Sequence, residues 1–133
     1  MRAAEPRPRG FLLDTTALID FLRGKKEVAA LLEVLMEKAP LATCPVTVAE
    51  VFAGTREKDA SKADQFLSTL VYYPITYSAA RLAGSLRYAY ARKGITLSLP
   101  DTLIAAVALE NGLAVVTANA GHFPMEQLIV IPH

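Results

Sequence analysis

Four polar residues have the types and positions needed for metal-assisted chemistry: Asp14, Glu50, Asp101 and Asn119. Asp14 ends the apolar run "FLL", Glu50 lies within "VTVAEVFA", and Asn119 follows the β-branched run "LAVVTA". Asp101 follows Pro100 at the start of a long apolar segment. Ligands of an open parallel sheet bind beyond the carboxyl ends of its strands. We therefore expect these four residues to converge on one edge of a sheet.

Each acid also has a purely structural interpretation. Asp14 could cap the helix that follows it, worth about 1 kcal/mol, and Asp101 near a helix start could gain roughly 0.3–1 kcal/mol from the helix dipole. Thr47 and Glu50 have the spacing of a capping box, but Pro45 favours an earlier helix start and puts Glu50 in the second turn. There Glu50 is expected in an apolar neighbourhood, which is costly unless the acid is paired or binds a metal ion.

Three carboxylates that meet would repel one another, and their pKa values would rise unless a cation joined them. Oxygen ligands favour a hard ion such as Mg²⁺ or Mn²⁺. Zinc is disfavoured, because the single Cys44 and the two histidines, His122 and His133, do not have zinc-ligand spacing. An Mg²⁺ ion lowers the pKa of water and stabilises charge on phosphoryl oxygens. If the acids converge, the sequence predicts a metal site suited to phosphodiester hydrolysis.

Alternating strands and helices would position these residues. Hydrophobic patterns predict strands at 10–13, 41–44, 113–119 and 128–133, and a short extended piece at 72–76. They predict helices at 15–23, 25–38, 45–53, 59–71, 78–93 and 99–111. The last helix is apolar nearly all round and should be the most buried. The alternation predicts one α/β domain with a parallel sheet flanked by helices.

Composition limits the class of protein. The chain has 133 residues, of which 53% are apolar and 20% charged, so it is neither disordered nor a charged coiled coil. We expect a loose basic arm over residues 1–9 and a single domain over residues 10–133. The single cysteine and the lack of an uninterrupted apolar run of membrane-spanning length predict a cytoplasmic protein that does not enter a membrane.

The net charge of +1 gives no overall attraction to nucleic acid, so any RNA must be held by local basic groups. The candidates are Arg23, Lys25, Lys26, Arg92 and Lys93. They also suit solvated helix ends, since cations favour helix C-termini. Asp20 is interpreted as a solvated residue or as a partner of Arg23.

Three segments together resemble PIN-domain proteins, above all the VapC-type toxins of bacterial and archaeal toxin–antitoxin pairs. They are "FLLDTTALIDFLRG", "VTVAEVFAG" and "LPDTLIAAVALENGLAVVTANAGHF", in the order and spacing of that family. The resemblance extends from Gly10 to the end of the chain. It implies a three-layer α/β/α sandwich and a Mg²⁺- or Mn²⁺-dependent endoribonuclease. It also implies a homodimer and a cognate antitoxin that covers the site.

The resemblance assigns a role to each candidate site residue. The three acids of the family fall on Asp14, Glu50 and Asp101, and its two hydroxyl positions fall on Thr16 and Thr117. Asp14 and Asp101 would hold the ion, while Glu50 would bind it through water or act as a base. Thr16 and Asn119 would position water or phosphate.

Two positions depart from the family pattern or add to it. Asn119 stands where aspartate is common, and because asparagine carries no charge, a second metal ion is in doubt. His122 fills a nearby position often taken by an acid, and it could equally be a surface-loop histidine.

Two alternatives stay open. A phosphohydrolase of the haloacid dehalogenase kind would use Asp14 as a nucleophile, but that class normally has a second acid two residues later, where this chain has Thr16. A catalytically silent PIN-fold module would keep the fold and act only through binding.

Overall fold

The computed structural model describes residues 7–133 and shows strands and helices in alternation. The strands are β1 (Gly10–Leu13), β2 (Leu41–Thr43), β3 (Val71–Tyr72), β4 (Leu113–Thr117) and β5 (Val130–Pro132). The helices are α1 (Thr15–Leu22), α2 (Lys26–Met36), α3 (Pro45–Ala53), α4 (Ala60–Leu67), α5 (Tyr77–Arg92) and α6 (Leu99–Asn111). Two short 3₁₀ turns, η1 (Glu57–Asp59) and η2 (Ala120–His122), complete these elements. The predicted α/β alternation is confirmed.

All strand pairs in the sheet are parallel, and the strand order is β3-β2-β1-β4-β5. The chain leaves β1 towards β2 on one side and later returns to place β4 on the other side of β1. The gap beyond the carboxyl ends of β1 and β4 is therefore the point where the strand order reverses. Open α/β sheets bind ligands at such a switch point.

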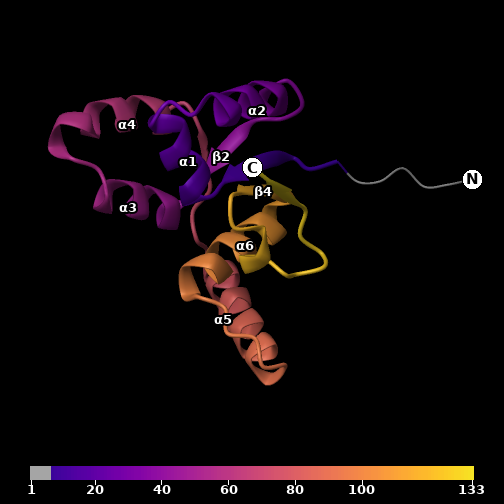
Figure 1. Cartoon of the computed structure of the whole chain (residues 1–133). Coiled ribbons are helices and arrows are strands. Elements are labelled where there is room, and N and C mark those ends of the chain that lie inside the picture. Colours follow the sequence, from indigo (N-terminus) through magenta and orange to yellow (C-terminus); the bar gives the residue numbers. More distant parts are fainter. Residues whose placement is uncertain (1–6) are drawn as a thin grey trace, which may run out of the picture.

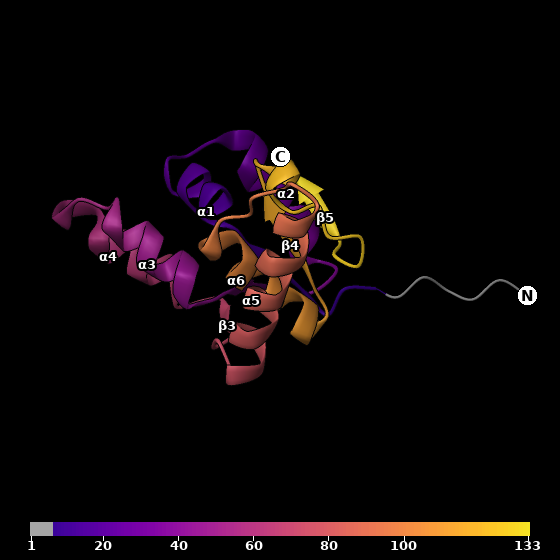
Figure 2. The ribbon, with the colours of Figure 1, turned by 90° about the horizontal axis from the view of Figure 1, so that it is seen from below.

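The central strands are buried on both faces. Leu12 of β1 and Val115 of β4 pack in one hydrophobic cluster with α5 and α6. Leu13 and Val116, the next residues along, pack in a second cluster with α1, α2, α3 and α4. Figures 1 and 2 show α5 and α6 lying apart from the group formed by α1 to α4. Because successive side chains of a strand point to opposite faces, continuous apolar strands give the predicted three-layer α/β/α sandwich.

Helix α6 lies at the centre of its layer, as its all-round apolar sequence predicts. Its residues from Ile104 to Ala108 are each 0% exposed. Ser98 caps the first turn, and Gly112 ends the helix with φ of +68°, a conformation that favours glycine. Neither α6 nor any other helix within residues 7–133 is long and apolar enough to cross a membrane.

The predicted helix at 59–71 extends too far. Helix α4 ends at Leu67, where the hydroxyls of Ser68 and Thr69 donate to carbonyls of the last helical turn. Val71 instead begins the edge strand β3, which pairs with β2. Side chains that bond back to the backbone compete with helix continuation, and the periodicity of apolar residues could not reveal this.

The predicted basic arm lies mostly outside the described residues. Of its nine positions, the structure describes residues 7–9. The backbone N–H of Arg9 donates to the carbonyl of Gly112 over 2.8 Å, just before β1 and β4 begin.

Candidate active site

Asp14 follows directly after β1, at the carboxyl edge of the sheet. Its backbone N–H donates to the carbonyl of Val116 over 2.9 Å, which extends the pairing of β1 with β4 by one residue. Its Oδ1 accepts a 2.7 Å hydrogen bond from the N–H of Thr15, so Asp14 is the N-cap of α1. Only 5% of Asp14 is exposed. The capping interpretation is therefore correct, and the cap fixes a buried carboxylate at the switch point.

Threonines from both sides of the switch point surround this carboxylate. Thr117, the last residue of β4, is 0% exposed and donates a 2.7 Å hydrogen bond to Oδ2 of Asp14. The hydroxyl of Thr16 lies 3.5 Å from the same oxygen and accepts from the N–H of Ala118 over 3.0 Å. The N–H of Asn119 donates to the Thr117 hydroxyl over 2.9 Å. The structure thus brings together four of the residues selected from the sequence.

Glu50 lies in the second turn of α3, as Pro45 predicts, because the helix begins at that proline. The alternative capping box is absent: Cys44 is the N-cap, and Thr47 is the third helical residue. The expectation of an apolar environment for Glu50 is wrong. Glu50 is exposed to solvent, while the next residue, Val51, is only 1% exposed. Successive helical residues point about 100° apart, so an apolar run can still turn one acid outward.

A residue not selected from the sequence connects Glu50 to Asp14. The hydroxyl of Thr15 donates a 2.6 Å hydrogen bond to Oε1 of Glu50, while its N–H caps into Asp14. One residue of α1 therefore contacts both carboxylates. The sequence signal was the pair of threonines after Asp14, of which only Thr16 was considered.

Asp101 lies in the first turn of α6, where its N–H donates to the Ser98 hydroxyl over 3.2 Å. Its carboxylate Oδ2 is 3.3 Å from Nδ1 of His122, which belongs to η2. The surface interpretation of His122 is thus incomplete: its side chain is 59% exposed, but it faces an acid of the candidate site.

The segment from Thr117 to His122 joins the two aspartates. It contacts Asp14 at its start and Asp101 at its end, and the N–H of His122 donates to the carbonyl of Asn119 over 2.9 Å within it. Five positions thus separate the contact with Asp14 from the contact with Asp101. Both acids therefore lie beside the short turn that leaves β4.

The donor atoms available here suit a hard divalent ion, because they are carboxylate, hydroxyl and amide oxygens. Within residues 7–133, however, no three Asp, Glu, His or Cys side chains gather closely enough to hold an ion together. Each acid has a protein partner instead: Thr117 for Asp14, Thr15 for Glu50 and His122 for Asp101. Binding of one ion by all three acids stays a prediction.

The PIN-domain family profile matches residues 11–124, from the middle of β1 to just after η2. This chain belongs to the PIN-domain family. It is 36% identical over 117 residues to the ribonuclease VapC19 of Mycobacterium tuberculosis, an alignment that covers 86% of this chain and 92% of that relative. Membership in the family removes support for the dehalogenase-like alternative, which Thr16 already disfavoured.

Solved structures agree with this assignment. The VapBC2 structure from Rickettsia felis, bound to promoter DNA, matches with a TM-score of 0.84 and 24% identity, covering 93% of this chain and 98% of that one. At that identity the match supports the fold alone. The DNA-bound VapBC structure from Salmonella typhimurium matches with a TM-score of 0.80 and 26% identity, covering 91% of this chain and 96% of that one.

Proposed function

We propose that this chain is a Mg²⁺- or Mn²⁺-dependent endoribonuclease and the toxin of a type II toxin–antitoxin pair. The observation that carries the proposal is the carboxylate of Asp14, buried at the switch point of a PIN fold and oriented by the hydroxyl of Thr117. The relative VapC19, whose length this chain covers to 92%, is named a ribonuclease.

Asp14 and Asp101 are proposed to hold the divalent ion, with Glu50 beside them. When bound, such an ion would lower the pKa of water and stabilise the charge that develops on phosphoryl oxygens. Asn119 adds no charge at the position where an acid is common, so we propose one ion rather than two. Thr117 orients Asp14, and His122 faces Asp101, and such outer partners tune the affinity of metal ligands.

Glu50 is the proposed base or water-positioning group. It is exposed to solvent, so a water molecule can reach its carboxylate. The 2.6 Å hydrogen bond from Thr15 restricts the orientation of that carboxylate. Thr16 and Asn119 are proposed to position water or the scissile phosphate, since both lie beside Asp14 at the end of β4.

An antitoxin protein and a second copy of the chain are the proposed protein partners, in a cytoplasmic setting. The Salmonella typhimurium neighbour is a VapBC structure bound to DNA, which supports a partner of the antitoxin kind. Exposed large apolar side chains, such as Tyr77 at 84% and Tyr88 at 66% exposure on α5, offer contact surface for a homodimer.

Cleavage of end-labelled RNA tests the proposal. The purified chain should cut RNA in Mg²⁺ or Mn²⁺ and stop in excess chelator. Asp14→Asn, purified identically, should lower the rate by about 100-fold or more, the scale for losing one group that stabilises developing charge. Asp20→Asn, a matched change on the same helix, should keep the activity.

Three results would contradict the proposal: cleavage in chelator, cleavage that survives Asp14→Asn, or no cleavage of any RNA. A chain that cuts no RNA and binds no Mn²⁺, but binds the product of a neighbouring gene, would instead be a silent PIN-fold module.

A further inference from the structure

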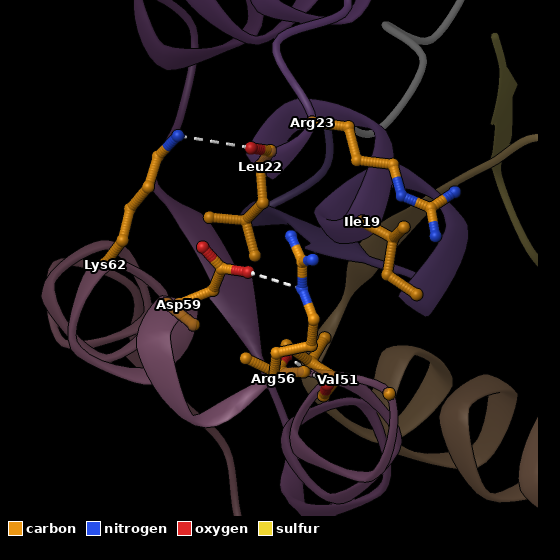
Figure 3. Close-up of a pocket in the computed structure, with 10 residues that line it drawn as sticks. Ile19, Leu22, Arg23, Val51, Arg56, Asp59 and Lys62 are labelled. Atoms are coloured by element: carbon orange, nitrogen blue, oxygen red, sulfur yellow. Dashed lines mark hydrogen bonds and ion pairs between the residues drawn. The ribbon is translucent and has the colours of Figure 1, made fainter.

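A cleft of about 540 Å³ lies between the C-terminal halves of α1 and α3 and the start of α4. Figure 3 shows side chains from these elements around it. Its apolar lining includes Ile19, Leu22, Val51 and Ala63. Its charged lining consists of Arg23, Arg56, Lys62 and Asp59. The cleft thus combines an apolar surface with clustered cations.

The charges of this cleft are not balanced. Nε of Arg56 lies 3.2 Å from Oδ2 of Asp59, which is the only carboxylate in the lining. Nζ of Lys62 donates to the backbone carbonyl of Leu22 over 3.3 Å, which leaves its charge uncompensated. Among residues 7–133, neither Lys62 nor Arg23 forms an ion pair with a carboxylate. Three cations against one acid give the lining a net charge of +2.

The expected partner of Arg23 is paired elsewhere. Asp20 lies 3.3 Å from Nζ of Lys25, so the interpretation that it pairs with Arg23 is wrong. Of the basic residues considered for RNA contact, Lys25 is therefore partly neutralised, whereas Arg23 lines the cleft. Arg92 and Lys93 instead lie over the rings of Tyr88 and Tyr90 on α5.

The cleft is continuous with the candidate active site. Helices α1 and α3 both begin at the carboxyl edge of the sheet, where Thr15 bonds to Glu50. Val51, the residue after Glu50, already lines the cleft. From Thr15 to Arg23 a helix rises about 12 Å, a length that corresponds to roughly three or four stacked nucleotides at about 3.4 Å each. A strand cut beside Asp14 and Glu50 can therefore reach Arg23.

We propose that this cleft holds the backbone phosphates of the RNA substrate on one side of the scissile bond. This inference rests on the proposed ribonuclease function. Separate, uncompensated cations suit a strand that carries one charge per nucleotide, and the chain has too little net charge to hold RNA without a local site. Arg23 and Lys62 supply the free charges, and Arg56 is partly held by Asp59.

Equilibrium binding of RNA in chelator tests this inference without cleavage. The probe is a fluorescein-labelled single strand of about 12 nucleotides, within the range that single-strand sites cover, and the readout is anisotropy across a salt series. The double variant R23Q/K62Q should bind about fivefold more weakly for each charge removed, the factor for a solvent-screened contact. Its slope of log K against log salt should fall by about 1.4, or about 0.7 for each phosphate contact.

Two further variants make the test specific. R92Q/K93Q removes the same charge from the end of α5, on the other face of the sheet, and should change the affinity and the slope far less. Asp59→Asn releases Arg56 and should tighten binding and steepen the slope. Thermal unfolding of each variant confirms that it is folded, and cleavage of the same RNA in Mn²⁺ by R23Q/K62Q should show a raised KM with a smaller change in kcat.

The outcomes separate this inference from the proposed function. If the wild type cuts RNA but R23Q/K62Q binds like the wild type, or no more weakly than R92Q/K93Q, the cleft assignment is wrong and the ribonuclease remains. If R23Q/K62Q instead loses only binding to an acidic partner peptide, the cleft is a protein-binding site and the inference fails. If the wild type neither binds nor cuts RNA, both fail together.

Discussion

The hydroxyl of Thr117 donates a 2.7 Å hydrogen bond to Oδ2 of Asp14, across 103 positions of the chain. This contact joins the ends of β1 and β4 at the switch point of the sheet. Both residues are buried, so the bond orients the carboxylate within the protein rather than at its surface. A metal ligand held in this way is already positioned before any ion binds.

Thr117→Val should lower both stability and metal affinity. Valine keeps the shape of threonine but leaves Oδ2 of Asp14 and the N–H of Asn119 without this partner, at a cost of about 1–3 kcal/mol in the free energy of unfolding. Mn²⁺ should bind about 10- to 100-fold more weakly. Urea unfolding and calorimetry measure the two effects. Thr117→Ser keeps the hydroxyl, so equal values for Val and Ser would contradict the proposed orientation.

Thr15→Val should lower turnover with little effect on folding. The bond from Thr15 to Glu50 is exposed, and surface changes of this kind usually stay within about 0.5 kcal/mol of the wild-type stability. A Glu50 carboxylate without this bond should reduce kcat about tenfold, the scale for an outer-shell partner, and leave KM nearly unchanged. Thr15→Ser should restore kcat. Failure of serine to restore turnover would show that Thr15 acts only through its size.

His122→Ala should weaken the Mn²⁺ affinity by about tenfold, because Asp101 loses the imidazole that lies 3.3 Å from its Oδ2. The amide nitrogen of asparagine can stand near the place of Nδ1, so His122→Asn should recover part of the loss. Calorimetry with Mn²⁺ compares the three proteins. An unchanged affinity in His122→Ala would return His122 to the role of a surface-loop residue.

Cys44 should react slowly with thiol reagents in the folded protein. Desolvation by burial raises the pKa of the Cys44 thiol above its ordinary value of 9.0, and the side chain is 0% exposed. The folded state therefore holds the thiol proton more tightly than the unfolded state, and the resulting stabilisation is present below pH 9.0 and is lost as the pH rises above it. A disulfide reagent at pH 8 should label the chain quickly only in denaturing urea. Rapid labelling without urea would contradict the buried position.

The sequence predicts the order of elements well, because alternating apolar runs and helix signals are local. The run "GFLL" and the segment "LPDTLIAAVALEN" correspond to β1 and α6 with the same bounds. The position of Asp14 after a central strand follows from the same reasoning. Its contact with Thr117 depends on the placing of β4 beside β1, which no local pattern specifies.

Other features depend on how elements pack and lie beyond such patterns. Glu50 is exposed because of the rotation of α3 about its axis, which the mixed sequence around it does not fix. The pair of Asp101 and His122 depends on the path of the turn after β4. The cleft that contains Arg23 and Lys62 exists only once α1, α3 and α4 have packed together.

Titration of the chain with Mn²⁺ in a calorimeter tests most directly whether Asp14 anchors a metal site at the switch point. The wild type should bind one ion per chain, and Asp14→Asn should lose measurable binding. Asp20→Asn is the matched control, because the same change on the same helix lies at a residue paired with Lys25, and it should bind like the wild type. Binding by Asp14→Asn with wild-type affinity would contradict the metal site on which the proposed ribonuclease depends.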